Sequence, residues 1–222
     1  GVGNAGNGGG CNDKSCQCGC SIPEVAGIGA NGLTYSSSRL FLGGGGGAGN
    51  NGNSNQYFGT SHSIGKNGGG IIHIQAAAIV GNNFEINAGG EDGADLSTAT
   101  STGTMGTAGG GGGGAILLNV GVFSNTSILA NGGKGSDSRK TAGSSNATGG
   151  SGGGGGGGYI SFSSATVPTG VSTSVSGGIA GTSFDREGDV RAIPFKGTDG
   201  SNGQVDFNYS TPFSNTTFSL GT

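Results

Sequence analysis

The chain has 222 residues, of which 57 are glycine and only 9% are charged, with a formal net charge of −3. Its nine Lys and Arg residues are scattered and form no basic stripe that could neutralise phosphates, so the sequence argues against a nucleic-acid partner. The longest apolar run, 71–80, contains His73 and Gln75 and falls well short of the roughly 20 residues that a membrane-spanning helix needs. We therefore expect no membrane span.

Residues 1–38 form a separate N-terminal segment that contains all four cysteines, Cys11, Cys16, Cys18 and Cys20. Structural zinc sites usually place two cysteine knuckles well apart, and this spacing is too compressed for that arrangement. The cysteines are predicted to form two local disulfides in one of three pairings, and a strained Cys16–Cys18 bridge is disfavoured. A metal site is the alternative. No general base lies nearby in sequence, so catalysis is not expected here.

Residues 33–42 (LTYSSSRLFL) are predicted to form a strand because they combine aromatic, leucine and β-branched residues ahead of a glycine run. Three later glycine runs lead directly into apolar segments that begin at Ile71, Ala115 and Tyr159, each 44 residues after the last. A fixed period of this length is typical of a repeat architecture, in which each unit buries its apolar face on its neighbour. The repeats are predicted to span 39–180.

Alignment of the three junctions predicts two apolar columns, because alternate residues of a strand point to opposite faces. The columns contain Ile72, Ile116 and Ile160, and Ile74, Leu118 and Phe162. A second strand is predicted after each first one, at 83–88, 126–130 and 172–176, and each is followed by a glycine pair. Two strands separated by a short corner and followed by a long excursion predict a right-handed parallel β-solenoid, an all-β fold.

The glycine runs are predicted to pack against one another as polyglycine-II-like segments. Such segments have no internal hydrogen bonds, so their polar backbone groups must be satisfied by neighbouring chains. Floppy solvent loops are the alternative. Residues 181–222 are richer in aromatic and charged residues and are predicted to cap the end of the repeats.

The sequence contains no recognisable catalytic motif, and we expect no enzymatic activity. A polysaccharide-active β-helix enzyme is the remote alternative, because it would need paired carboxylates and the predicted strands offer only Glu85. The acids on predicted loops are weak candidate calcium ligands, with solvated turns as the alternative. These candidates are Glu91, Asp92, Asp95, Asp185 and Asp189. No other cofactor is expected.

The repeated pattern GGGGGG-AILLNV…TSILANGG, with its two partner copies, resembles the glycine-rich repeats of large secreted surface proteins of Bacteroidota-type bacteria. This resemblance covers residues 33–180. It implies export to the extracellular cell surface and a structural or adhesive role, and it supplies no catalytic residues. A looser resemblance is to the polyglycine-sandwich adhesins at phage tail-fibre tips.

The predicted function is therefore an extracellular structural or adhesive protein that presents Ser-, Thr- and Asn-rich excursions on a rigid scaffold. The excursions at 91–108 and 134–151 are the predicted contact surface for a host or surface glycan or protein. A self-associating subunit of an extracellular fibre and a phage receptor-binding adhesin are the alternatives. The sequence does not identify the ligand.

Overall fold

The computed structural model describes residues 27–33, 40–49, 64–95, 106–139, 150–184 and 197–209, and the account of the fold concerns these residues. They contain nine β-strands and no helix. Consequently none of them belongs to a helix that is long and apolar enough to cross a membrane.

Every strand pairing is parallel, and the strands form three sheets. The largest sheet has the order β1-β3-β6-β9, the second has the order β2-β4-β7, and β5 pairs with β8. The strands are β1 (Ile71–Val80), β2 (Glu85–Asn87), β3 (Ala115–Ser124), β4 (Thr126–Leu129), β5 (Ser138–Arg139), β6 (Tyr159–Phe162), β7 (Val171–Ser174), β8 (Ser183–Phe184) and β9 (Gln204–Asp206). The prediction of an all-β chain with parallel sheets is confirmed for the described residues, and none of these sheets closes on itself.

The register of the large sheet pairs the residues that the junction alignment placed together. Ile72 lies beside Ile116, which lies beside Ile160, and the neighbouring column is Ile74, Leu118 and Phe162. These columns pack against Ile128 of β4 to form the hydrophobic core between the two larger sheets. The core residues on β3 and β6 are almost fully buried, whereas those on β1 are only half-buried because β1 is an edge strand.

The corner between the first and second strand of each repeat is built on residues with positive φ. Asn82, Asn83 and Asn125 have φ values of 47°, 66° and 46°, and Gly170 has a φ of 80°. Asn and Gly tolerate this left-handed region better than other residues. The corners also bond to one another, because Asn83 N–H donates to the Asn125 carbonyl and Thr126 N–H donates to the Gly170 carbonyl.

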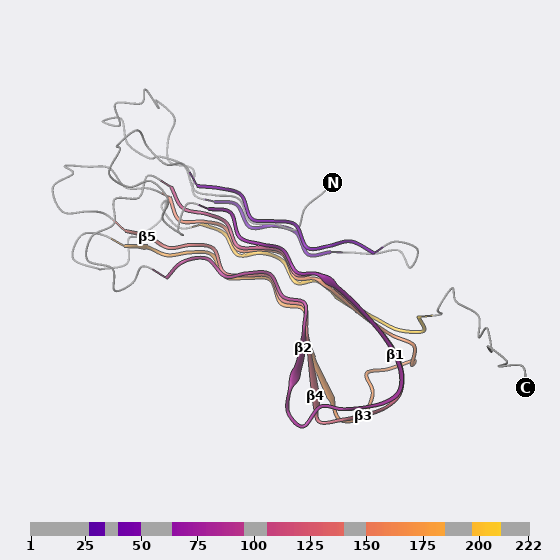
Figure 1. The fold of residues 1–222 in the computed structure, drawn as a ribbon. Coiled ribbons are helices and arrows are strands. Elements are labelled where there is room, and N and C mark those ends of the chain that lie inside the picture. The colour runs from indigo at the N-terminus through magenta and orange to yellow at the C-terminus, as the bar shows by residue number, and fades with distance from the viewer. Residues whose placement is uncertain are drawn as a thin grey trace, which may run out of the picture.

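The glycine-rich segments lie side by side in three layers (Figure 1). The middle layer contains residues 65–70, 109–114, 152–158 and 197–203. The lower layer contains residues 88–93, 130–136 and 175–181, and the outer layer contains residues 27–33 and 40–49.

The segment 109–114 shows how these layers hold together. Its successive N–H groups donate in three directions that repeat every third residue. Gly109 and Gly112 donate to the outer layer, at 2.9 and 2.9 Å, and Gly110 and Gly113 donate to the neighbouring middle-layer segment, at 3.0 and 2.9 Å. Gly111 and Gly114 donate to the lower layer, at 3.1 and 2.8 Å. Each segment is therefore satisfied by its neighbours and not by itself.

At several glycines the spacing between these segments leaves no room for a side chain. A Cβ added at Gly111 would collide with the carbonyl oxygen of Asn67, and one added at Gly155 would collide with that of Gly111. The same collision recurs at Gly200, against the Gly155 carbonyl. Glycine is required at these positions because neighbouring backbones approach too closely for any other residue.

The repeat pattern did not predict that residues 27–33 and 197–203 belong to these layers. Ala30 N–H donates to the Gly154 carbonyl, and Gly154 N–H donates to the Thr198 carbonyl, both at 3.0 Å. In the predicted strand 33–42, the described residues Leu33 and 40–42 are in no strand, and 34–39 lie outside the described residues. The neighbours of this segment are glycine-rich and present backbone groups, not a second apolar face. Leu33 N–H accordingly donates to the Gly157 carbonyl at 2.9 Å.

Gly114 and Gly70 provide a matched pair for testing close packing, because they are equivalent positions in successive repeats. A Cβ on Gly114 would collide with the Gly70 carbonyl oxygen, whereas a Cβ on Gly70 would have no atom within 4 Å. We expect Gly114→Ala to lower the free energy of unfolding by about 1–3 kcal/mol or more through overpacking. We expect Gly70→Ala to leave stability unchanged or to raise it by about 0.4–1 kcal/mol. Denaturant unfolding of both variants measures this, and equal effects would contradict the layer packing.

Candidate functional site

The described residues that flank the excursions lie at one end of the layers, away from the corners (Figure 1). Gly106 forms a parallel bridge with Gly150, and Thr107 N–H donates to the Gly150 carbonyl at 3.2 Å. Strands β5 and β8, which lead into later excursions, pair with each other. Gly197 N–H donates to Ser151 Oγ at 2.9 Å. The described ends of three excursions therefore lie close together.

Small polar residues are buried where these ends meet. Thr107 Oγ1 donates to the Ser136 carbonyl at 2.7 Å, and Ser138 Oγ donates to Ser183 Oγ at 2.9 Å. Thr107 and Ser136 are 0% exposed, and Ser138 is 2% exposed. Buried hydroxyls are tolerated because they are hydrogen-bonded, and such bonds hold the excursion ends in fixed positions.

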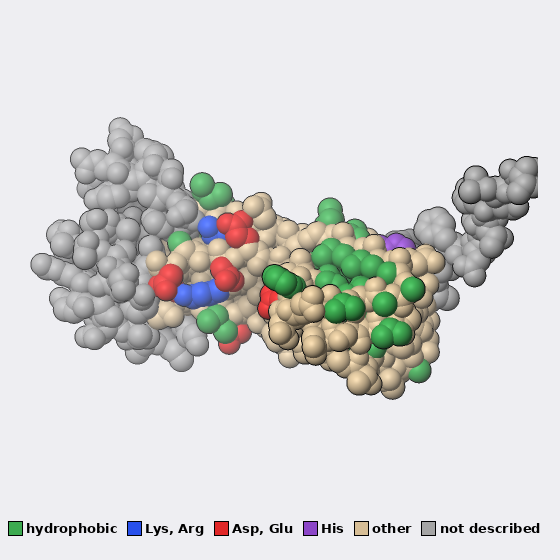
Figure 2. All heavy atoms as spheres, turned by 60° about the horizontal axis from the view of Figure 1, so that its bottom comes forward, with side chains coloured by type: hydrophobic (Ala, Val, Ile, Leu, Met, Phe, Trp, Pro, Cys, Tyr) green, Lys and Arg blue, Asp and Glu red, His purple; other side chains and the backbone are tan. Residues whose placement is uncertain are grey.

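Charged residues gather beside the same end of the described chain (Figure 2). The Asp137 side chain is 1% exposed, and its two oxygens have different partners. Lys134 Nζ lies 3.0 Å from Asp137 Oδ2, and Thr182 N–H donates to Asp137 Oδ1 at 2.8 Å. A buried carboxylate needs such partners. The bond from Thr182 to Asp137 also ties the second repeat to the third.

The candidate calcium ligands in the described residues have protein partners. Glu91 Oε2 accepts bonds from Asn67 N–H and Asn67 Nδ2 at 3.2 and 2.8 Å, and Lys66 Nζ lies 3.8 Å from Glu91 Oε1. Asp92 Oδ1 accepts a bond from Lys134 N–H at 2.7 Å. Within the part of the chain that the structure describes, no three His, Cys, Asp or Glu side chains are grouped as metal ligands.

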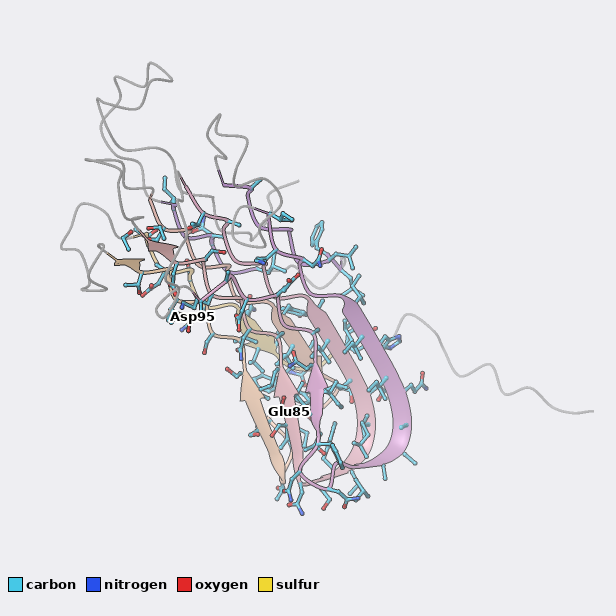
Figure 3. The ribbon with its side chains drawn as sticks, turned by 60° about the vertical axis from the view of Figure 1, so that its left-hand side comes forward. Glu85 and Asp95 are labelled. Atoms are coloured by element: carbon cyan, nitrogen blue, oxygen red, sulfur yellow. The ribbon has the colours of Figure 1, made fainter. Side chains whose placement is uncertain are left out.

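Other candidate residues from the sequence are dispersed. Glu85 is exposed on β2 and Asp95 lies in a different part of the structure, near the excursion end (Figure 3). Asp185 and Asp189 lie outside the described residues. The cysteines Cys11, Cys16, Cys18 and Cys20 lie outside them as well.

An open groove of about 640 Å³ lies between the middle and lower layers next to β2. Its polar lining consists of Asn67, Asn87, Glu91, Asp92 and Asn131, with glycine backbone between them. Asn87 Oδ1 accepts a bond from Gly89 N–H at 2.7 Å, and Asn131 Oδ1 accepts one from Ser176 N–H at 2.9 Å. These bonds fix the two amides, and the groove can offer hydrogen bonds to a polar molecule.

Tyr159 is a buried tyrosine whose hydroxyl lies beside an acidic side chain. Its ring is 4% exposed and packs with Ala115 and Leu117, while its hydroxyl donates to Asp206 Oδ2 at 3.1 Å. Burial raises the pKa of the Tyr159 phenol, and the hydrogen bond and negative charge of Asp206 raise it further, against an opposing hydrogen bond with Ser161. The protonated phenol is therefore favoured in the folded chain.

The comparisons with known proteins leave the chain without an assigned relative. No family model matches it, and neither the curated proteins nor the solved structures contain a match. Inferences about function therefore rest on the chain itself.

Sequence reasoning missed the buried polar residues at the excursion ends and the two additional layer segments. One signal could have located those segments, because glycine recurs at every third position in both. It occurs at Gly29 and Gly32, and again at Gly197, Gly200 and Gly203. The structure gives this spacing its meaning, because every third residue faces the same neighbour.

The Tyr159 geometry predicts a stability difference that depends on pH. At neutral pH, Tyr159→Phe should lower the free energy of unfolding by about 1 kcal/mol, the typical net value of one hydrogen bond. The raised pKa stabilises the folded chain fully below the ordinary tyrosine value of about 10, and this stabilisation is lost as pH rises through the folded-state pKa. Denaturant unfolding from pH 7 to pH 11 should show the wild-type advantage shrinking above about pH 10. A constant difference would contradict the assignment.

Proposed function

We propose that this protein is an extracellular, cell-surface scaffold with a structural and adhesive function, which presents its excursions to a glycan or protein ligand. The observation that carries this proposal is the meeting of the excursion ends at one end of the layers, shown by the Gly106–Gly150 bridge and the β5–β8 pair. Segments that start and finish at one end of a rigid body can form one contact surface, as binding loops do.

We propose further that the repeats are turns of a right-handed parallel β-solenoid with polyglycine-II-like segments. Each repeat runs from a glycine segment through a strand, a corner and a second strand into a lower glycine segment, and its strands pair in parallel with the next repeat. Parallel crossover connections are right-handed in nearly all proteins, which supports that hand. The donation of N–H groups in three directions supports the polyglycine-II geometry.

The rigidity of the scaffold follows from the glycine layers. Because successive N–H groups of 109–114 donate to three different neighbours, this segment cannot move without breaking bonds to all three. A rigid base lowers the conformational entropy that a ligand must remove when it binds to the excursions. The proposed role is non-catalytic, since its chemistry is hydrogen bonding by hydroxyl and amide groups.

A phage receptor-binding adhesin is the second candidate function. It is favoured by the packed glycine layers, because these are the feature on which the looser resemblance to polyglycine-sandwich adhesins rests. The two candidates differ in ligand source, which is a host or surface glycan or protein in the first case and a bacterial cell in the second. Binding to immobilised glycans and to intact bacterial cells separates them.

Excursion replacement tests the adhesive proposal. We expect replacement of residues 96–105 or of 140–149 by Gly-Ser linkers of equal length to reduce binding on a glycan and protein panel, because polar contacts are lost. The expected loss is about tenfold or more, which corresponds to about 1.4 kcal/mol of binding free energy. The control is Ser127→Ala/Ser172→Ala, which removes only an exposed hydroxyl pair at 3.0 Å on β4 and β7. Unchanged binding after both replacements would remove the basis of the proposal.

A further inference from the structure

The two end faces of the middle layer carry complementary backbone groups. Inside the layer, Gly110 N–H donates to the Gly153 carbonyl and Gly113 N–H donates to the Gly156 carbonyl, so two bonds are formed three residues apart. The next pair of segments repeats this pattern, with donors at Gly154 and Gly157. The segments 109–114 and 152–158 thus each give two donors to the middle-layer segment that follows them in the chain.

At the last described segment of this layer, the equivalent donors are the N–H groups of Asp199 and Asn202. The register that pairs Tyr159 with Gln204 makes these residues the counterparts of Gly154 and Gly157. At the first segment, the equivalent acceptors are the carbonyls of Gly65 and Gly68. Within the described residues, none of these four groups takes part in a hydrogen bond. Among the described residues, one end therefore offers two donors and the other offers two acceptors, with the same spacing.

Two side chains of the first repeat leave the backbone toward the position that a preceding segment would occupy. A Cβ on Gly111 would collide with the Asn67 carbonyl of the preceding segment, and a Cβ on Gly133 would collide with the Glu91 carbonyl. Asn67 and Glu91 are the counterparts of Gly111 and Gly133 in the first repeat, before which no middle-layer or lower-layer segment is described. Their side chains point outward from the end face.

These two side chains are also bonded to each other. Asn67 donates from its backbone N–H and from Nδ2 to Glu91 Oε2, and Lys66 Nζ lies 3.8 Å from the other oxygen of Glu91. The position of Lys66 is taken by Gly110 and Gly154 in the next two repeats. Side chains thus replace glycines in the first repeat, and their mutual bonds hold them across the end face.

At the opposite end, side chains close the lower layer. Asp199 Oδ1 accepts a bond from Ala180 N–H at 2.7 Å, and Asn202 Oδ1 accepts one from Gly177 N–H at 3.0 Å. Their counterparts Gly154 and Gly157 cannot carry side chains, because a Cβ there would collide with the Gly178 and Val175 carbonyls. An approaching Glu91 would therefore also meet the Asp199 carboxylate, a like charge.

We propose that Asn67 and Glu91 keep copies of this protein apart, and that the end face they cover is a latent head-to-tail interface for a second copy. In that interface, the Asp199 and Asn202 N–H groups of one copy donate to the Gly65 and Gly68 carbonyls of the next. Removing both side chains opens the space that backbone-to-backbone packing requires. Head-to-tail contacts that do not close into a ring produce open chains. This inference concerns the two end faces of the middle layer and is independent of the proposed adhesive function.

The test is the double substitution Asn67→Gly/Glu91→Gly, studied by sedimentation velocity over a range of concentrations. We expect the wild type to remain monomeric and the variant to show a weight-average mass that rises roughly twofold or more with concentration. Hydrogen exchange should show new protection at the amides of Asp199 and Asn202 in the associated variant, which non-specific aggregation would not produce at these two sites.

Two control variants test whether association depends on removing the side chains that cover the end face, and not on a change in composition or polarity. Glu85→Gly/Asn87→Gly removes the same two residue types from β2 and should stay monomeric. Asn67→Ala/Glu91→Ala removes the polar groups but retains the Cβ atoms, so it should stay monomeric as well. If the double glycine variant loses amide protection in 109–114, the single Asn67→Gly variant takes its place. A folded glycine variant that remains monomeric, or a wild type that associates through Asp199 and Asn202, overturns the proposal.

Discussion

The structure depends on backbone groups that can be satisfied only by other segments of the chain at a spacing that excludes a Cβ. All six N–H groups of the segment 109–114 donate to other segments, which lie in the outer, middle and lower layers in turn. Because a buried unpaired amide costs free energy, these segments are stable only together. Glycine content therefore has a geometric cause in this protein, although the same composition is typical of disordered chains.

The apolar core and the glycine layers support each other through a shared register. Ile116 and Leu118 can be buried between β1 and β6 only if the preceding glycines hold neighbouring repeats at the strand spacing. The core in turn fixes which glycine faces which carbonyl, since one residue of slippage would bring side chains into the layers. The corners reinforce this register, because Asn125 and Gly170 stack in left-handed conformations.

The positions where a residue with a side chain replaces a layer glycine are informative for the same reason. Asn67 and Glu91 occur where no earlier middle-layer or lower-layer segment is described, and Asp199 and Asn202 occur where no further lower segment is described. Each of these side chains takes part in hydrogen bonds that a neighbouring backbone supplies elsewhere. Residue type thus reports whether a segment lies inside the layers or at their surface, and a chain with such ends can present its excursions as a discrete unit.

The sequence by itself determined the repeat, the two apolar columns and the position of the second strands, because a fixed period and alternating residues depend only on local strand geometry. It did not predict the outer layer or the fourth middle-layer segment, since 27–33 and 197–203 lack the apolar strand that marks a full repeat. The sequence also did not predict that Thr107, Ser136 and Asp137 are buried, because small polar residues are typical of exposed loops. Only the tertiary structure decided these features, because it brings together residues about 45 or more positions apart whose polar groups complete one another.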